Sequence, residues 1–398
     1  MKRRSFISTG VAGLAGIGAL GATGAGRKLF GQPQAQAQSQ KSSSAKAFIT
    51  RKLGKTGLVL PVVSMGVMNS DNPDLVRAAL DGGLVHLDTA HGYQRGTNEG
   101  MIGKVVAGRP RDSYVIATKV QGVPRDRQTG LFSPETKAET FLQMFDTSLQ
   151  RLGLPYVDIL YLHNVLKRES VLFEPLLEAL QKVKKEGKAR FIGVSTHGGE
   201  PEVIRAVLEA KVHDVVLTSY NFKMANLKEI DAAIADAVKA GVGIVAMKTM
   251  AGRFRDEEGQ QPINVKAALK WALNNPNITT AIPGMTTFDQ LAMDIEVARD
   301  ITLTPDEIKD LKLEAPVAGL FCQQCGKCLP QCPREVPVPA LMRGYMYAYG
   351  YRNVELAREV KAEAGVSGNP CGDCERCAVS CAMRFDIKSR VTSLSALA

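Results

Sequence analysis

Eight short apolar runs, each followed by an amphipathic stretch, fill the middle of this chain and restrict its fold more than any other feature. The runs are Val59–Val67, Leu84–Asp88, Tyr114–Val120, Val157–His163, Ala189–Ser195, Val215–Tyr220, Gly243–Met250 and Thr279–Pro283. Residues with helical spacing follow each run, as in Pro175–Gly187. Repeated strand–helix units form parallel sheets covered by helices, and eight in succession close into a barrel. We therefore predict an α/β fold with a (βα)8 TIM barrel over residues 49–316.

The alternative fold for such an alternation is a doubly wound open sheet. That fold usually carries a glycine-rich phosphate loop directly after its first strand. No such loop follows Val59–Val67, which favours the barrel. The 398 residues suffice for a barrel and one smaller domain.

The eight cysteines lie in two runs near the end of the chain, each with the spacing C-x2-C-x2-C-x3-C. The runs contain Cys322, Cys325, Cys328 and Cys332, and then Cys371, Cys374, Cys377 and Cys381. This spacing is typical of bacterial proteins with two [4Fe–4S] clusters, in which the fourth cysteine of each run binds the other cluster. It predicts that Cys381 completes the first cluster and Cys332 the second. Because Val338–Gly350 and Val354–Ala364 have helical spacing, we expect residues 317–398 to form a small, mainly helical iron–sulfur domain.

Zinc sites and disulfides are the competing interpretations of these cysteines. Zinc sites usually use two C-x2-C pairs, which would leave the third cysteine of each run without a role. Disulfides would have to join close neighbours with poor geometry. One departure from the cluster pattern is that Pro333 follows the first run whereas Ala382 follows the second.

The first residues resemble a twin-arginine signal peptide. Arg3 and Arg4 precede a weakly apolar run, Val11–Gly26, and the small-x-small sequence Ala35–Ala37 fits a cleavage site. We predict a signal peptide at residues 1–37, a linker at 38–48, and export of the folded protein to the periplasm by the twin-arginine machinery. The run is shorter than the ~20 apolar residues of a membrane span, so no stable span is expected after cleavage. The alternative is a cytoplasmic protein with a fortuitous basic start.

The basic net charge does not indicate a nucleic-acid partner. Five of the Lys and Arg residues lie in the predicted signal peptide, and without them the net charge falls from +10 to +5. No run of Lys and Arg interleaved with aromatic residues occurs, so we predict no nucleic-acid binding.

Polar residues stand where chemistry occurs in such barrels, at the carboxyl ends of the strands. They are Asp88, Lys119 and His163, with Tyr93 in the loop after Asp88. A lysine held by a carboxylate should lower the pKa of a neighbouring tyrosine from its usual ~10. Such a tyrosine can protonate a carbonyl oxygen while a hydride reaches the carbon. Taken singly, each residue could instead be structural, as a helix cap, a rim charge or a core histidine.

Several stretches resemble the aldo/keto reductase family, in order and at barrel spacing: HLDTAHGY, IATKV, DILYLHN, GVSTH, SYNF and AIPGMTTFDQL. The similarity spans about Thr50–Asp300, and the final part is similar to the subgroup with a twin-arginine signal and a fused iron–sulfur domain. The resemblance implies that Tyr93 is the general acid, that Lys119 and Asp88 tune it, and that His163 orients the carbonyl.

The same resemblance implies a nicotinamide cofactor, NADPH or NADH, bound in extended form. The corresponding positions hold Ser195, Thr196, Tyr220, Lys248, Gly284, Thr286, Gln290 and Asp294. Thr196 and Leu217 stand where the family usually has Asn and Gln, which departs from its pattern. We expect Tyr220 to stack on the nicotinamide, and either Lys248 or Arg253 to meet the pyrophosphate. The carboxylate of Asp294 would repel a 2′-phosphate, so we expect no tight selectivity for NADPH.

Two functions agree with this sequence. The first is an exported oxidoreductase that interconverts a small carbonyl and its alcohol by hydride transfer, with two [4Fe–4S] clusters relaying electrons to a redox partner protein. The second is an electron-transfer protein whose barrel is a docking scaffold without turnover. The complete set of Asp88, Tyr93, Lys119 and His163 favours the first, and the altered cofactor positions favour the second.

Overall fold

A computed structural model describes residues 46–126, 129–250, 263–311, 322 and 324–397 of the chain. The predicted signal peptide, residues 1–37, residues 38–45 of the predicted linker, and Arg253 lie outside the described residues. From Lys46 onward the chain forms one compact unit.

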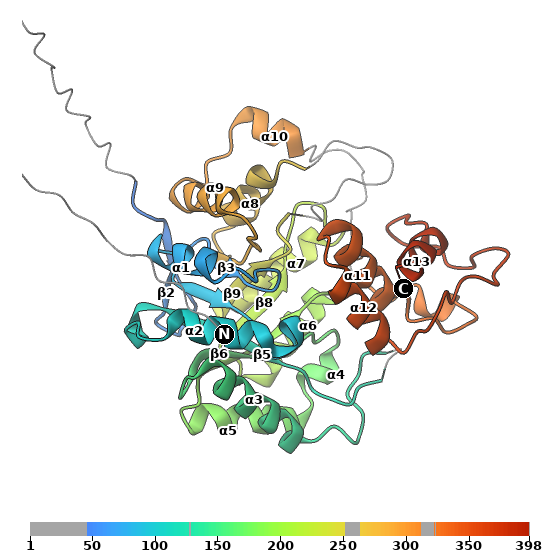
Figure 1. The fold of residues 1–398 in the computed structure, drawn as a ribbon, viewed down its shortest axis with the longest axis horizontal. Coiled ribbons are helices and arrows are strands. Elements are labelled where there is room, and N and C mark those ends of the chain that lie inside the picture. The colour runs from blue at the N-terminus through green and yellow to red at the C-terminus, as the bar shows by residue number, and fades with distance from the viewer. Residues whose placement is uncertain (1–45, 127–128, 251–262, 312–321, 323, 398) are drawn as a thin grey trace, which may run out of the picture. The chain divides into compact units, whose positions relative to one another are not determined.

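The central element is a sheet of eight parallel strands in sequential order (Figure 1). They are β3 Met65–Gly66, β4 His86–Asp88, β5 Val115–Val120, β6 Val157–Leu162, β7 Ala189–Thr196, β8 Val215–Ser219, β9 Gly243–Met247 and β10 Thr280–Ala281. Parallel bridges from Val63 to Ala281 and from Gly66 to Gly284 join the first strand to the last. The sheet is therefore closed, and the predicted barrel is confirmed.

The first predicted strand differs from the observed structure, because Val59–Val67 is divided in two. Its first part is β2 Val59–Pro61, which pairs antiparallel with β1 Thr50–Lys52 in a separate two-stranded sheet. Only β3 belongs to the barrel. Leu60 of the hairpin and Leu53 beside it are fully buried with inward-facing barrel residues. The apolar pattern thus continues across two elements because both contribute to the barrel interior.

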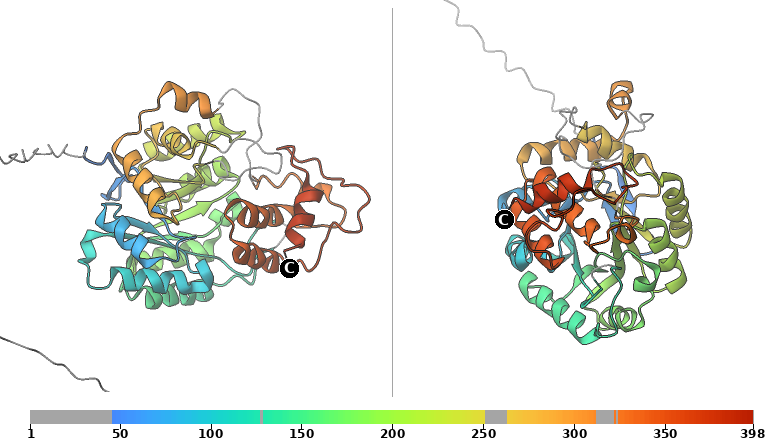
Figure 2. Two further views of the ribbon diagram at one scale, coloured as in Figure 1. Left: turned by 45° about the horizontal axis from the view of Figure 1, so that its top comes forward. Right: turned by 90° about the vertical axis from the view of Figure 1, so that its right-hand side faces the viewer.

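Helices surround the sheet (Figure 2). They are α1 Pro73–Asp81, α2 Thr97–Val106, α3 Ala138–Leu152, α4 Arg168–Val171, α5 Glu174–Lys185, α6 Glu200–Ala210, α7 Leu227–Lys239, α8 Val265–Asn274, α9 Phe288–Arg299 and α10 Pro305–Leu311. Successive strand residues face opposite ways. Ile116 accordingly packs in the cluster shared with the helices, whereas Val115 and Ala117 pack inside the barrel. At α1, the Asn72 side chain accepts hydrogen bonds from two backbone amides of the first turn, which fixes where the helix begins.

The C-terminal region, described from residue 324 onward, is mainly helical. It contains the short helix η3 Leu329–Gln331, then α11 Val338–Tyr345, the π-helix η4 Met346–Gly350, α12 Val354–Glu363 and α13 Ile387–Ser395. Its core joins Leu341, Met342 and Leu394 to Phe222 and Ala268 of the barrel. The helices lie where the spacing predicted them, and their core is continuous with the barrel.

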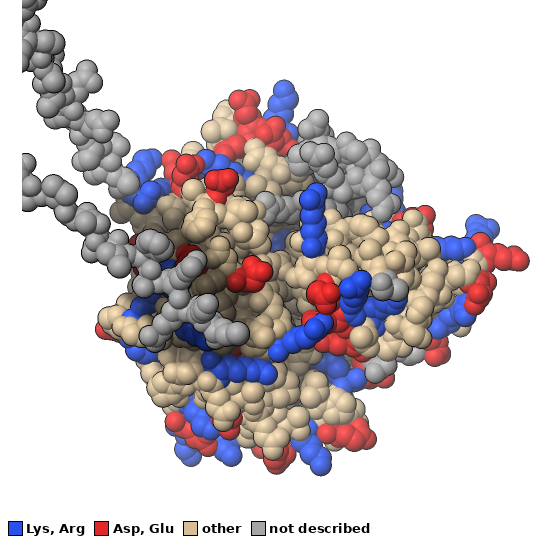
Figure 3. Space-filling model, in the orientation of Figure 1, with Lys and Arg blue, Asp and Glu red and all other residues tan. Residues whose placement is uncertain are grey.

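Two surface properties bear on binding partners. In Figure 3, basic and acidic side chains are interspersed over the visible face, with no large area of a single sign. Among the residues that the structure describes, no helix combines the length and hydrophobicity that a membrane crossing requires.

Candidate active site

The loop after β4 and the end of β5 bring a tyrosine, a lysine and an aspartate into one hydrogen-bonded chain. The Lys119 ammonium donates to a carboxylate oxygen of Asp88, to the backbone oxygen of Thr89 at 2.7 Å and to the phenol oxygen of Tyr93 at 3.2 Å. Tyr93 opens the short helix η1 Tyr93–Gly96. Lys119 and Asp88 are each 1% exposed, so the ion pair is shielded from water. The three residues are thus positioned to act as one proton-transfer unit.

Burial governs the acidity of this group. The pKa of Tyr93 is raised, because burial disfavours the phenolate more strongly than Lys119 favours it. This corrects the prediction that the ammonium gives Tyr93 a pKa below its usual value. The pKa of Lys119 is also raised, because Asp88 and Tyr93 outweigh the effect of its burial. At neutral pH the site therefore holds a protonated phenol beside a charged ammonium.

His163 follows β6 directly and faces Tyr93, with the two rings edge to face and their centroids 6.1 Å apart. Its pKa is held well below the usual range by burial and by the positive charges of Lys119, Arg125 and Arg343. The imidazole is therefore neutral at pH 7, and it can donate one hydrogen bond to a carbonyl oxygen without carrying charge. Arg125 donates to the backbone oxygen of His163 at 3.1 Å and to that of Asn164 at 2.8 Å, which fixes the loop that carries the imidazole.

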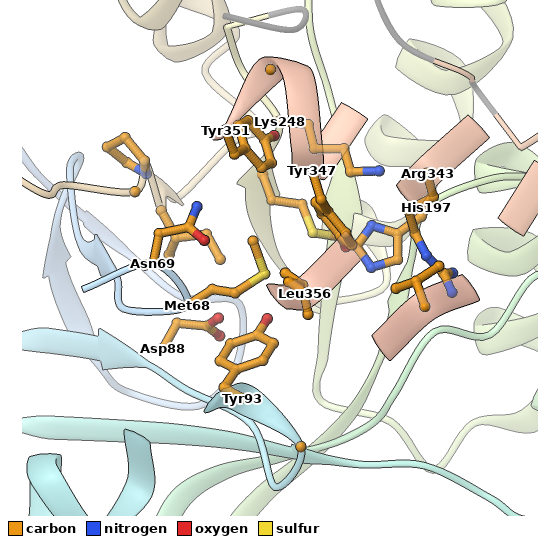
Figure 4. A pocket seen from close by; sticks show the side chains of 18 of the residues that line it. Met68, Asn69, Asp88, Tyr93, His197, Lys248, Arg343, Tyr347, Tyr351 and Leu356 are labelled. Atoms are coloured by element: carbon orange, nitrogen blue, oxygen red, sulfur yellow. The ribbon is translucent and has the colours of Figure 1, made fainter. Parts of the chain in front are cut away.

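A cavity of about 610 Å³ opens beside these residues, and two parts of the chain line it (Figure 4). The barrel contributes Asp88, Tyr93, His163, His197 and Lys248. The C-terminal helices contribute Arg343, Tyr347, Tyr351, Leu356, Glu359 and Glu363, among others. The sequence did not predict that these helices border the barrel mouth.

Polar contacts link α12 and its cap to the loops after β3 and β4. Arg95, two residues after Tyr93, donates to Glu359 at 2.6 Å and to Glu355 at 3.0 Å. Asn353, which caps α12, donates to Asn69 at 3.1 Å. The loop that carries Tyr93 is thus linked to α12 across the edge of the cavity.

The sequence profile of the Aldo/keto reductase family matches residues 64–267, a segment that includes Asp88, Tyr93, Lys119 and His163. The chain belongs to the aldo/keto reductase family. It is accordingly an oxidoreductase of aldo/keto reductase type, with the barrel fold of that family.

Curated relatives and solved structures agree with this assignment. L-galactose dehydrogenase of Arabidopsis thaliana is 27% identical over 63% of this chain and 88% of the relative. L-glyceraldehyde 3-phosphate reductase of Escherichia coli K12 is 24% identical over 66% and 90%. Aldo-keto reductases of Bacillus halodurans (holo form, 23% identity) and Klebsiella pneumoniae (in complex with NADPH, 22% identity) share the fold. Their TM-scores are 0.56 and 0.54, over 68% of this chain and 98% and 96% of theirs.

Of the eight cofactor positions inferred for this aldo/keto reductase, four line the cavity: Lys248, Gly284, Thr286 and Gln290. The structure does not bring Ser195, Thr196, Tyr220 and Asp294 to the cavity, since all four are buried and absent from its lining.

Local contacts account for three of these buried side chains. The Ser195 hydroxyl accepts from the Asn164 amide at 2.9 Å, and the Thr196 hydroxyl donates to the backbone of Gly198 at 2.8 Å. Tyr220, expected to stack on the nicotinamide, instead stacks on Trp271 at 5.4 Å between ring centroids. Its hydroxyl donates to Asp231 at 2.7 Å.

All eight cysteines are free thiols in the structure. Their electrostatic neighbours divide them into two sets. Burial, and then the neighbouring Cys322, Cys325 and Cys381, raise the pKa of Cys328 to about 12. The pKa of Cys371 is likewise raised by burial and then by Cys374, Cys377 and Cys332.

These two sets of four cysteines are the ones that the crossed ligation pattern predicts. Their thiols, however, do not converge as the ligands of one metal centre would. In the described part of the chain, no three His, Cys, Asp or Glu side chains lie close enough to hold a metal ion.

Sequence reasoning missed two groups at the cavity. His197 lies after β7, with its ring centroid 6.3 Å from that of His163, and it had only its position at a strand end to indicate a role. Arg343 carries no signal in the sequence, because its place depends on how α11 packs against the barrel.

Proposed function

We propose that this aldo/keto reductase interconverts a small carbonyl compound and its alcohol by hydride transfer, with Tyr93 as general acid and base. The observation that carries the proposal is the chain from Asp88 through Lys119 to the Tyr93 phenol at the edge of the cavity. Proton donors held within hydrogen-bond reach of a reacting oxygen typically contribute about 10²–10⁴-fold to a rate.

The protein groups divide the work as follows. Asp88 keeps Lys119 in place and charged, and the raised pKa of Tyr93 keeps its proton available at neutral pH. When the phenol gives its proton to the carbonyl oxygen, the ammonium at 3.2 Å stabilises the phenolate that remains. His163, neutral and facing Tyr93, donates a hydrogen bond that orients the same oxygen.

NADPH or NADH would supply the hydride when bound. Gly284, Thr286 and Gln290 line the cavity directly before and within the first turn of α9. Helix N-termini favour phosphate groups, because their unpaired amides and positive dipole end point outward. Lys248 adds a cation on the same cavity. This donor set fits a dinucleotide, and a solved relative from Klebsiella pneumoniae is described in complex with NADPH.

We further infer that the cysteine-rich region holds two [4Fe–4S] clusters. The spacing of the two runs and the division of the thiols into crossed sets of four both support the inference. Cys322, Cys325, Cys328 and Cys381 would hold one cluster, and Cys371, Cys374, Cys377 and Cys332 the other. The clusters would supply single-electron transfer toward a redox partner protein. Cys322 interacts electrostatically with Lys248 of the cavity, which supports its set as the one nearer the catalytic residues.

Export is proposed on the N-terminal sequence alone. The pair Arg3 and Arg4 before an apolar run supports delivery of the folded protein to the periplasm by the twin-arginine route. Fractionation of cells that express the chain should place it outside the cytoplasm. Replacing both arginines by lysine should retain it inside, and unchanged export would contradict the proposal.

A second candidate function is an electron-transfer protein with a barrel that does not turn over. The position of Tyr220 favours it, because a ring stacked on Trp271 does not reach the cavity where a nicotinamide would bind. Anaerobic titration with NADPH and NADH, followed by nicotinamide fluorescence, separates the two functions. Saturable binding of either nucleotide supports the reductase, and no binding of either supports the electron-transfer protein.

A further inference from the structure

Two cationic side chains from distant parts of the chain meet at the cavity. Lys248 follows β9 of the barrel, and Arg343 belongs to α11 of the C-terminal region. Both line the cavity. In Figure 4, Arg343 lies next to His197, with Lys248 and Tyr347 on the same side of the cavity. The C-terminal region therefore adds a positive charge to the barrel mouth.

The positive charges on this side of the cavity repel one another. Burial and then Arg343 lower the pKa of Lys248 to about 8, with Glu200 and Cys322 acting in the other direction. Burial and the charges of Lys248, Arg343 and Lys119, together with His163, hold the pKa of His197 well below its usual range. Like charges held together in a poorly hydrated place raise the free energy of the empty site, and a bound anion relieves that repulsion.

Two acidic side chains that line the cavity, Glu359 and Asp88, are paired with cations, whereas Glu363 and Glu200 act on groups beside Arg343 and Lys248. Glu359 is hydrogen-bonded to Arg95, and Asp88 to Lys119. Glu363 acts electrostatically on Arg125 and Tyr347. Glu200 is 2% exposed, and burial raises its pKa to about 7, so it compensates the cations only in part at neutral pH.

Arg343 acts on the residues that would bind the substrate carbonyl. Its charge acts on His163, the group that would orient the carbonyl, and on Tyr347, which in turn interacts with Tyr93. Of the residues expected to meet the cofactor phosphates, Thr286 and Gln290 lie at the start of α9, and Lys248 lies on the same side of the cavity as Arg343.

We propose that Arg343 binds an anionic group, a carboxylate or a phosphate, on the substrate whose carbonyl lies between Tyr93 and His163. A guanidinium can hold either group through two parallel hydrogen bonds. The proposal rests on the proposed carbonyl chemistry and adds to it a substrate class. It makes the cysteine-rich region part of the substrate site, because that region supplies the charge that selects the substrate.

A matched pair of aldehydes tests the proposal in the full-length protein. 4-Carboxybenzaldehyde carries an anion, and 4-nitrobenzaldehyde is a neutral counterpart of similar size. Arg343→Gln should raise KM for the carboxylate by roughly 10–100-fold, the range for losing a hydrogen bond to a charged group. KM for the neutral aldehyde should stay within about twofold, which shows that the variant is folded. Arg343→Lys should lower KM for the carboxylate part of the way back, since lysine restores the charge but not the planar guanidinium that forms two parallel hydrogen bonds.

Arg358→Gln is the matched control, because it removes the same charge from an exposed position on α12 that does not line the cavity. It should leave both KM values unchanged. The proposal would be overturned if Arg343→Gln raised KM equally for the two aldehydes, or if it did not raise KM for the carboxylate. It would also be overturned by an unchanged KM for the carboxylate with a raised Kd for NADPH, which would assign Arg343 to the cofactor phosphates.

Binding without turnover separates this proposal from the proposed function. Calorimetric titration with 4-(hydroxymethyl)benzoate, the alcohol product, should show binding to the wild-type protein that Arg343→Gln weakens. If that result is obtained while neither aldehyde is reduced, the anion site stands and the reductase function is wrong. No binding to the wild-type protein would overturn the anion site.

Discussion

The guanidinium of Arg95 donates to the carboxylate of Glu359 at 2.6 Å and so connects the loop that carries Tyr93 to helix α12. Arg95 has a left-handed backbone, with φ of 54°, and lies two residues after Tyr93. The Arg95 side chain is 70% exposed and that of Glu359 24%. Exposed ion pairs contribute little to global stability. Their effect here is therefore expected in the placement of the loop.

Glu359→Gln should lower kcat several-fold for both test aldehydes and change the free energy of unfolding by less than about 1 kcal/mol. The reason is that η1 loses an anchor while the barrel core is untouched. Arg95→Gln should reproduce the effect, and Glu229→Gln, an exposed change of the same charge on α7, should have none. A full kcat in both anchor variants would show that the contact does not position Tyr93.

His213 should make the fold sensitive to acid. Burial lowers its pKa from 6.5 to about 4, and neither ring nitrogen has a hydrogen-bond partner among the described residues. Between these two values the unfolded chain takes up a proton that the folded chain refuses, so stability falls as the pH drops from 6.5 to 4. The contribution of this residue is about 3 kcal/mol when fully lost.

His213→Leu should weaken this pH dependence while stability at pH 7 stays within about 1 kcal/mol, because the lost imidazole made no hydrogen bond. Urea unfolding at several pH values measures both quantities. His86, whose pKa is also lowered to about 4 by burial, stays in place and retains its own share of the acid sensitivity. An unchanged pH slope in the variant would assign the acid sensitivity to other groups.

The crossed cysteine sets predict which variants resemble one another. Cys322→Ser and Cys381→Ser should disturb the same cluster, and Cys332→Ser the other, although Cys332 lies in the same run as Cys322. Iron content and electron paramagnetic resonance of the reduced, anaerobic protein distinguish the clusters. Ser380→Ala, next to Cys381, is the control and should leave the spectrum intact. If Cys322→Ser and Cys332→Ser instead disturbed the signal of the same cluster, each run would hold its own cluster.

The barrel was predictable, and so was the meeting of Asp88, Lys119, Tyr93 and His163, because both depend on local regularities. Apolar runs and helical spacing located the strands, and strand ends located Lys119 and His163. The raised pKa of Tyr93 was not predictable, because it depends on how much water the finished fold excludes. The stacking of Tyr220 on Trp271 was equally hidden, since it joins residues that meet only after the barrel closes.

The sequence pattern also did not predict which residues form the C-terminal side of the cavity. The spacing located α11 and α12 but gave no indication of which of their side chains would line the cavity at the barrel mouth. Arg343 and Tyr347 reach the cavity through packing between distant segments, and such packing leaves no periodic trace.

Steady-state reduction of 4-nitrobenzaldehyde and 4-carboxybenzaldehyde by the Tyr93→Phe variant tests the central claim most directly. Phenylalanine keeps the ring against His163 and removes only the hydroxyl that Lys119 contacts. The account predicts that kcat/KM falls at least about 100-fold for both aldehydes, with binding of 4-(hydroxymethyl)benzoate retained. Activity close to that of the wild-type protein would contradict it, because another group would then be donating the proton.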